Sequence, residues 1–328
     1  MENKPDSGYA KDNNGLPIDY TSNIPRFSVE SSAELEDGVT YLNENGYVVF
    51  KDVLSNDEVN SNIDLFWKHL EKLPRPYFIR RNNFETWNNW PGMPHIGLVQ
   101  DYGIGQSEYM WNHPITKPNR CSVQGLVAMT DNNEFTGGLI VFPGTHNQFD
   151  ELKDLVTVND RRGDYVRVPY EHRIFKQLPP NEKEFRVGKL IKCKAGDLVI
   201  WDSRTIHCNT PALNTPINSL DHQVEKTGLL RIVAYVTMTP TSFVQPCNWE
   251  YRNLKEFRKH RKQYVKANYT LTHWPHELNI ATAPQYLSEN TLQLNSYQKS
   301  LITGINLNDS DIKYQTESSD EENADSNN

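Results

Sequence analysis

Short apolar runs alternate with turn-forming residues between residues 121 and 240. The runs are "SVQGLVAMT", "GGLIVFPG", "FRVGKLIKC", "AGDLVIWD" and "LLRIVAYVTMTP". They are rich in β-branched residues, and Gly, Pro, Asn and Asp punctuate them. Runs of this length and composition favour antiparallel strands in a sandwich or jelly roll. The pattern therefore predicts a mainly β core.

A helical pattern precedes these strands. The stretch "NGYVVFKDVLSNDEVNSNIDLFWKHLEKL" predicts a short strand over 47–50 and a helix over 55–73. Ser55 and Glu58 have the spacing of a capping box, in which each side chain bonds the other residue's backbone N–H. The apolar residues that recur at helical spacing are Val59, Ile63, Phe66 and Leu70. We expect this helix to pack on the outside of the β core.

A second helix, basic and amphipathic, is predicted after Pro240 in "EYRNLKEFRKHRKQYVKANY". Its cations are Arg252, Lys255, Arg258, Lys259, Arg261, Lys262 and Lys266. The ordinary interpretation of such a charge run is the solvated face of a surface helix. A contact with a phosphate-bearing substrate or with nucleic acid is the alternative.

Composition narrows the class of protein. The 328 residues are 37% hydrophobic, which is enough for one large core or two modest ones. A net charge of −8 gives no general attraction to nucleic acid or anionic lipid. The N-terminus does not resemble a signal peptide, and no apolar stretch approaches the roughly 20 residues that span a bilayer. We therefore expect a cytoplasmic protein that binds a small molecule rather than nucleic acid or a membrane.

The cysteines and the two ends of the chain indicate the redox state of the thiols and the limits of the folded domain. The cysteines Cys121, Cys193, Cys208 and Cys247 are widely spaced, which indicates reduced thiols. Residues 1–30 are poor in large apolar side chains, and 306–328 end in the acidic run "ESSDEENADSNN". Such segments do not bury a core. We expect disorder over 1–30 and 306–328 and a single domain over 31–305.

His207 and Arg231 are the candidate functional residues of the predicted barrel. His207 follows "AGDLVIWD", and we expect it to end that strand at the barrel mouth. Arg231 begins the later run "RIVAYV". An imidazole can bind a metal there, and a guanidinium can hold a carboxylate. A hydrogen-bonded loop residue is the alternative interpretation of a histidine at the end of a strand.

Several motifs resemble those of the phytanoyl-CoA dioxygenase-like group of Fe(II)/2-oxoglutarate oxygenases. They are "NGYVVFKDVLSNDEV", "SVQGLVAMTDNNEFTGGLIVFPGTHNQF", "KAGDLVIWDSRTIHCNTPA", "RIVAYVTMTP" and "HWPHE", in the family's order. The resemblance implies a double-stranded β-helix, which is a jelly-roll barrel. It also implies Fe(II), held by a His-x-Asp pair and a distal histidine, and the cosubstrate 2-oxoglutarate. His207 matches the distal histidine, Arg231 the arginine that binds 2-oxoglutarate, and His146 a structural or substrate-side position.

The chain departs from the family pattern at the His-x-Asp pair. The corresponding stretch, "EYMWNHPITKPNRCSVQG", offers His113 as the first histidine, but Ile115 stands where the aspartate is expected. The family's segment before this strand is missing here, so the jelly roll is expected to be incomplete. The metal ligands that remain are His207 and His113. Two neutral imidazoles without a carboxylate bind Fe(II) weakly.

Three hypotheses for the function stay open. The first is an Fe(II)/2-oxoglutarate-dependent oxygenase that hydroxylates a small or lipid-like molecule. The second is an inactive oxygenase fold, or pseudoenzyme, that serves as a binding or regulatory module. The third is an unrelated jelly-roll protein, such as a cupin-like binder or isomerase. The missing acid separates the first two, and the sequence leaves the substrate and the oligomeric state open.

Overall fold

A computed structural model describes most of the β core and several helices. The described residues are 9–12, 15–72, 79–89, 103–104, 122–155, 166–176, 186–212, 229–238, 252–266, 270–271, 280–282 and 295–303. The chain divides into two compact units, Met1–Met238 and Thr239–Asn328. The single domain expected over 31–305 includes residues of both units and stays a prediction, and the segment expected to be disordered over 306–328 lies outside the described residues.

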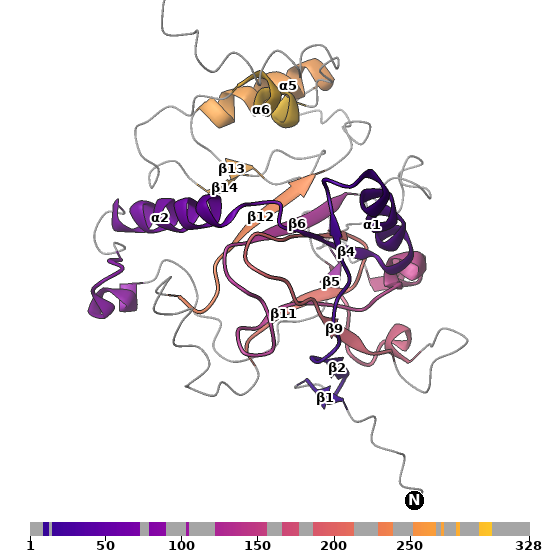
Figure 1. Cartoon of the computed structure of the whole chain (residues 1–328). Helices are drawn as coiled ribbons and strands as arrows, with labels where there is room; N and C mark the ends of the chain where they lie inside the picture. Colours follow the sequence, from indigo (N-terminus) through magenta and orange to yellow (C-terminus); the bar gives the residue numbers. More distant parts are fainter. Residues whose placement is uncertain are drawn as a thin grey trace, which may run out of the picture. The chain divides into compact units, whose positions relative to one another are not determined.

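The first unit is mainly β, with flanking helices (Figure 1). Its strands are β1 (Ala10–Lys11), β2 (Pro17–Asp19), β3 (Arg26–Ser28), β4 (Tyr47–Lys51), β5 (Gly103–Ile104), β6 (Val123–Ala128), β7 (Gly138–Val141), β8 (Val166–Arg167), β9 (Gly188–Leu190), β10 (Leu198–Asp202), β11 (His207–Thr210) and β12 (Val233–Met238). Its helices are α1 (Ser32–Asn45) and α2 (Asn56–Lys72), with 3-10 segments η1 (Phe84–Asn89), η3 (Thr145–Leu155) and η5 (Arg173–Phe175).

The described strands form two sheets in this unit. One has the order β1-β2-β9-β7-β11-β5-β8 and the other the order β12-β6-β10-β4-β3. Each apolar run of residues 121–240 contributes a strand, and the pairs that these strands make with one another are antiparallel. The predicted mainly β fold with flanking helices, in a jelly-roll arrangement, is confirmed.

Alternation along the strands places one apolar face of each sheet in a shared core. Val199 and Trp201 of β10 pack there with Leu139 and Val141 of β7, which belongs to the other sheet. Side chains of a strand point alternately to its two faces. The register of these strands therefore decides which residues face the interior between the sheets.

Helices and short segments cover the outer faces. Val59, Ile63, Trp67 and Leu70 of α2 are buried in a cluster that includes Ile232, beside β12. The capping box of α2 is confirmed: the backbone N–H of Ser55 donates to the Glu58 carboxylate at 2.8 Å, and that of Glu58 to the Ser55 hydroxyl at 3.3 Å. Trp67, which the apolar pattern did not single out, lies on the same buried side as the predicted residues.

The expectation of disorder over 1–30 is wrong for residues 15–30. Strand β2 pairs in parallel with β9, and Leu16, Ile18 and Tyr20 are buried in the cluster on the outer face of the first sheet. Strand β3 pairs in parallel with β4. The segment contains few apolar residues, but Leu16, Ile18 and Tyr20 alternate along it. They pack against apolar side chains on the outer face of the first sheet. Burial against the sheet offsets the entropy of ordering the segment.

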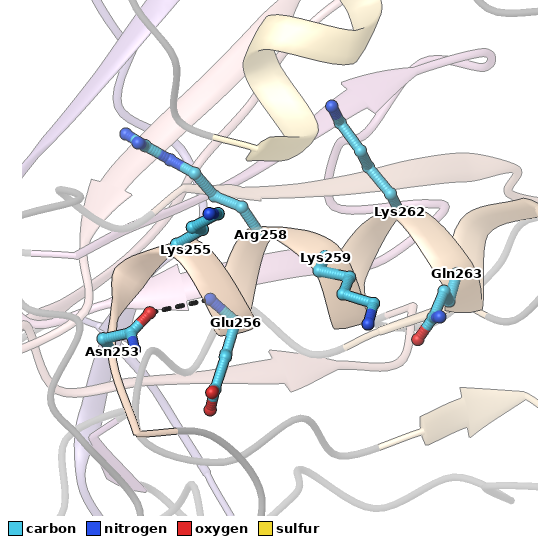
Figure 2. Close-up of a pocket in the computed structure, with 7 residues that line it drawn as sticks. All are labelled: Asn253, Lys255, Glu256, Arg258, Lys259, Lys262 and Gln263. Atoms are coloured by element: carbon cyan, nitrogen blue, oxygen red, sulfur yellow. Dashed lines mark hydrogen bonds between the residues drawn. The ribbon is translucent and has the colours of Figure 1, made fainter.

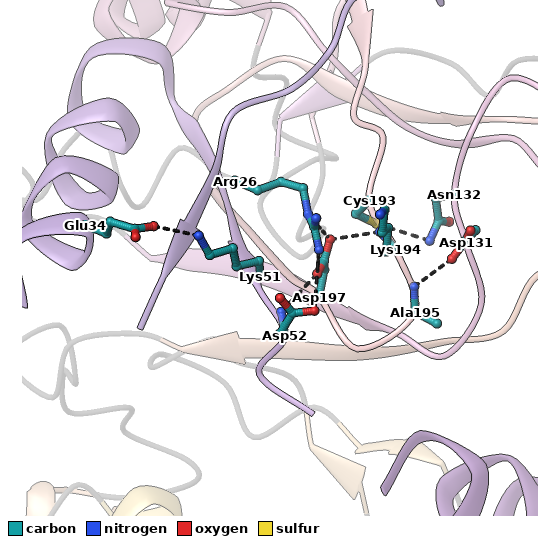
Figure 3. A network of polar contacts seen from close by, with 10 residues as sticks. All are labelled: Arg26, Glu34, Lys51, Asp52, Asp131, Asn132, Cys193, Lys194, Ala195 and Asp197. Carbon is teal, nitrogen blue, oxygen red and sulfur yellow. Dashed lines mark hydrogen bonds and ion pairs between the residues drawn. The ribbon is translucent and has the colours of Figure 1, made fainter. Parts of the chain in front are cut away.

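A buried ion pair ties this N-terminal segment to the turn before β10 (Figure 3). The Asp197 side chain is fully buried and accepts bonds from Arg26 Nε at 2.8 Å and Nη2 at 2.6 Å. It also accepts from the backbone N–H groups of Asp52 at 3.1 Å and Lys194 at 2.8 Å. The aspartate of the "AGDLVIWD" motif is therefore a structural residue that fixes the start of β10.

The second unit contains helix α5 (Leu254–Lys266), strands β13 (Thr270–Leu271) and β14 (Ile280–Thr282), which pair, and helix α6 (Ser296–Thr303). The predicted basic helix is confirmed as α5. Arg261 Nε donates to the Ile302 carbonyl oxygen at 2.7 Å, so α5 and α6 lie against each other. Among the described helices of the chain, none has the length and apolar character needed to span a membrane.

Candidate functional site

His207 opens strand β11 instead of ending β10. Strand β10 stops at Asp202, and the turn that follows carries the chain from the second sheet to the first. His207 lies opposite Val141 of β7, and opposite residues of an antiparallel pair share one face. Val141 belongs to the core between the sheets. His207 therefore faces the interior, and its predicted place at the end of β10 is wrong by one turn.

The orientation of the His207 ring follows from one local bond. Its Nδ1 lies 2.7 Å from the Thr205 carbonyl oxygen. A carbonyl oxygen only accepts, so Nδ1 carries the proton and Nε2 keeps its lone pair. Burial lowers the pKa of His207, although the bond to Thr205 opposes this change. The Trp201 ring, 5.5 Å away between centroids, packs beside the imidazole.

The turn before His207 is held by helix α1. Gly46, which caps α1 at a φ of 80°, accepts a bond from the Thr205 hydroxyl at 3.0 Å through its carbonyl oxygen. A Cβ on Gly46 would collide with that hydroxyl and would lie 2.6 Å from His146 Nδ1. The His146 ring is buried, and its Nε2 donates to the Asn43 carbonyl oxygen at 2.8 Å. These contacts support a structural role for His146.

Arg231 lies two residues before the start of strand β12. The strand starts at Val233, so the prediction that Arg231 begins the strand is wrong by two residues. The Ile232 N–H donates to the Thr130 hydroxyl at 2.9 Å, which fixes this approach. Ile232 packs with α2 on the outer face, and Val233 packs against the core between the sheets. The Met129 N–H donates to the Ile232 carbonyl oxygen at 3.0 Å, so the pairing of β6 with β12 continues past Val233, and Arg231 has the alternation of Val233.

The Arg231 guanidinium has unused hydrogen-bonding capacity. Its Nη1 is buried and has no hydrogen-bond partner in the described structure. Burial raises the pKa of the Cys193 thiol to about 12, Asp197 adds to the rise, and the positive charge of Arg231 partly opposes it. A buried guanidinium N–H without an acceptor is costly, and an anionic ligand would satisfy it.

Two asparagines that the sequence patterns did not single out also have a buried side-chain atom without a hydrogen-bond partner. The buried Oδ1 atoms of Asn132 and Asn209 lack hydrogen-bond partners in the described structure. Asn209 lies two residues after His207 and so on the same face of β11. Asn132 Nδ2 donates to the Cys193 sulfur at 3.3 Å. The sequence could have indicated Asn209, because it follows His207 with His-x-Asn spacing. It could not have indicated Asn132, which only the fold brings to Cys193.

The metal-binding hypothesis rests on few described residues. His113, its second predicted ligand, lies outside the described residues. No group of three His, Cys, Asp or Glu side chains that could hold a metal occurs in the described parts of the chain. Asp202, close to His207 in sequence, is bound instead by Arg204, with Nη2 and Oδ2 2.5 Å apart. Cys193 and Cys208 are buried and reduced, and Cys121 and Cys247 lie outside the described residues.

Sequence comparison identifies related proteins. Residues 82–213 match the family model of phytanoyl-CoA dioxygenase (PhyH). A Dictyostelium discoideum protein named "Putative phytanoyl-CoA dioxygenase" is 22% identical over 233 residues, covering 69% of this chain and 57% of that protein. The chain thus spans a little more than half the length of this curated relative.

Solved structures were compared as well. The protein JW0805 from Escherichia coli has a TM-score of 0.45 at 13% identity, over 87% of this chain and 86% of that one. EvdO2 from Micromonospora carbonacea var. aurantiaca has a TM-score of 0.33 at 13% identity, over 54% and 84%. The epimerase SnoN, in complex with Fe3+, alpha ketoglutarate and nogalamycin RO, has a TM-score of 0.37 at 13% identity, over 64% and 86%.

The matched segment contains the strands β6, β7, β9, β10 and β11, and with them His207 and both asparagines. Arg231 lies beyond it. The resemblance that the motifs indicate is thereby confirmed: residues 82–213 of this chain are similar to the phytanoyl-CoA dioxygenase family.

Proposed function

We propose that this protein is a 2-oxoglutarate-dependent oxygenase-like protein whose interior between the two sheets binds 2-oxoglutarate through Arg231. When active, it hydroxylates a small or lipid-like molecule. The observation that carries the proposal is the buried Arg231 Nη1, which has no hydrogen-bond partner in the described structure. A carboxylate is the acceptor that a guanidinium binds best.

The residues around Arg231 fit the cosubstrate. A dicarboxylate brings oxygen acceptors for the guanidinium, whereas the unsatisfied Oδ1 atoms of Asn132 and Asn209 need a donor, which a bound water can supply. His207 faces the same interior from the first sheet, with the Nε2 lone pair available. Apolar walls from Trp201 and Val141 exclude water and strengthen charge-assisted bonds there.

Iron fits less completely. Bound Fe(II) supplies oxygen activation in oxygenases that hold it with two histidines and a carboxylate. The neutral His207 with a free Nε2 suits such a metal, but the described residues add no second or third ligand to it. We therefore derive no chemical step through iron from these residues.

The second candidate function is a binding or regulatory module that retains the cosubstrate pocket without catalysis. Ile115 in place of the acidic residue favours it, since a site without an anionic ligand leaves the charge of Fe(II) poorly balanced. Both candidates predict binding of 2-oxoglutarate. They differ in whether Fe(II) binds and whether the cosubstrate is consumed.

Calorimetric titration of the purified chain with 2-oxoglutarate, with and without Fe(II) under anaerobic conditions, tests the proposal. Admission of oxygen and assay of succinate then test turnover. Binding together with iron-dependent succinate formation supports the oxygenase. Binding without iron uptake or succinate supports the module. If 2-oxoglutarate fails to bind in either condition, both candidates are wrong.

A further inference from the structure

Helix α5 carries a basic face on the side away from its buried residue. Lys255, Arg258, Lys259 and Lys262 follow one another at spacings of three and four residues, which places them on one side of the helix. Phe257, which points to the other side, is buried. These four cations line a hollow of about 840 Å³ together with Asn253, Glu256 and Gln263. Figure 2 shows the seven side chains along the helix. We call the four cations the α5 basic face.

Three lysines of the basic face lack compensating charge in the part of the chain that the structure describes. Lys255, Lys259 and Lys262 make no ion pair there. The one acid on this part of the helix, Glu256, turns toward the helix start, where its carboxylate accepts from the Arg252 backbone N–H at 2.7 Å. Like charges three and four residues apart repel each other and destabilise a helix. An acidic partner would remove this repulsion.

The same unit contains a segment of opposite charge. Residues 317–325, "ESSDEENAD", hold five acids and no Lys or Arg, and they lie outside the described residues. The acids are Glu317, Asp320, Glu321, Glu322 and Asp325. Few other stretches of this chain concentrate so much negative charge. A free polyanion approaching this chain would meet repulsion from its net charge of −8.

Covalent connection brings the segment within reach of α5. Helix α6 ends at Thr303, and the bond from Arg261 to Ile302 holds that end against α5. The 13 residues 304–316 span up to about 40 Å when extended, whereas the 13 residues of α5 are about 20 Å long. A tether of this length gives millimolar effective concentration, so even weak ion pairs become occupied.

We propose that residues 317–325 bind the α5 basic face within the same molecule. The carboxylates neutralise Lys255, Lys259 and Lys262, and the hollow along α5 accommodates the segment. The contact is electrostatic, so salt weakens it. This inference concerns the second unit and does not depend on the proposed oxygenase function.

Two measurements on the full chain test the contact. A carbodiimide joins a carboxylate directly to an amine, and peptide mapping should find links from Lys255, Lys259 or Lys262 to residues 317–325 within the monomer. A glutamate-specific protease should cut after Glu321 and Glu322 slowly at low salt. At 1 M salt, where the screening length is about 3 Å, the links should disappear and cleavage should accelerate.

A charge-neutral variant sharpens the test. Lys255→Gln, Lys259→Gln and Lys262→Gln together should raise the cleavage rate after Glu321 roughly fivefold or more, because cleavage follows the population of the open form. The matched control is Lys68→Gln with Lys72→Gln, which changes two exposed lysines of α2 and should leave the rate unchanged. Equal rates in the chain and the triple variant would overturn the proposal. Links that join two molecules, or that spread evenly over all lysines, would do so as well.

Discussion

His207 Nδ1 donates a hydrogen bond to the Thr205 carbonyl oxygen at 2.7 Å, and this bond turns the Nε2 lone pair of His207 to the interior between the sheets. A residue that folds back on the turn preceding it has a fixed ring and a fixed tautomer. A hydrogen bond from the Thr205 hydroxyl to the Gly46 carbonyl oxygen attaches this turn to the end of α1. The orientation of the candidate ligand thus depends on a helix more than 150 residues away in sequence.

We expect replacement of His207 to weaken metal binding. Loss of a ligand removes more affinity than loss of a residue that only orients one, for which 10- to 100-fold is typical, so His207→Ala should cost roughly tenfold or more. Titration with Mn(II) followed by electron paramagnetic resonance measures this. His69→Ala, at an exposed position of α2, is the control. Equal Mn(II) affinity in a folded His207→Ala variant would exclude His207 as a ligand.

Arg231→Ala should weaken binding of 2-oxoglutarate by about 1.5–3 kcal/mol, the range for a hydrogen bond to a charged group. The reason is the loss of the guanidinium whose Nη1 lacks a partner in the described structure. Isothermal titration calorimetry gives the affinity. The control is Arg81→Ala, which removes an arginine that pairs with Asp64 on α2. Unchanged affinity in a folded Arg231→Ala protein would show that the carboxylate binds elsewhere.

Gly46→Ala should destabilise the first unit by about 2 kcal/mol or more. The residue has a φ of 80°, and an added Cβ would collide with the Thr205 hydroxyl. Gly15→Ala is a matched control, because Gly15 has a φ of 82° with open space around it and carries the backbone strain alone. Urea unfolding measures both. A Gly46 variant no less stable than the Gly15 variant would contradict the described packing.

Asp197→Ala should be among the most destabilising substitutions, at about 3–5 kcal/mol, the range for breaking a buried ion pair from one side. It leaves Arg26 and two backbone N–H groups without their acceptor. Chemical unfolding monitored by tryptophan fluorescence gives the change. Asp64→Ala removes the acid of an exposed ion pair with Arg81 and should cost at most about 1 kcal/mol. Similar losses in the two variants would show that the Asp197 pair is not buried.

Stability should fall as the pH drops below 6.5. Burial lowers the pKa values of His146 and His207 below the ordinary histidine value of 6.5. Above pH 6.5 both rings are neutral in the folded and unfolded chains, so stability is unaffected by them. Below 6.5 the unfolded chain takes up protons that the folded chain does not, and stability is lost until the folded pKa is reached. Urea unfolding between pH 8 and 5 checks this, and His207→Gln should flatten the slope.

The sequence by itself determined the elements with strong local signals. The capping box of Ser55 and Glu58 and the apolar spacing after it fixed α2, and short β-branched runs between turn residues fixed β6, β7, β9, β10 and β12. The motifs around His207 also indicated a resemblance to the phytanoyl-CoA dioxygenase family, and residues 82–213 match that family's model. Local hydrogen bonding and side-chain periodicity act over a few residues, so the amino-acid order displays them directly.

Only the tertiary structure decided what depends on residues distant in sequence. Residues 15–30 look too polar to fold, yet β2 and β3 are ordered because each pairs with a strand of a sheet already formed. Arg231 Nη1 and the Oδ1 atoms of Asn132 and Asn209 lack hydrogen-bond partners in the described structure because the fold buries them. No local sequence pattern encodes this burial. The change of sheet between Asp202 and His207 likewise follows from the turn that Gly46 holds, and this long-range contact sets the direction in which the candidate ligand points.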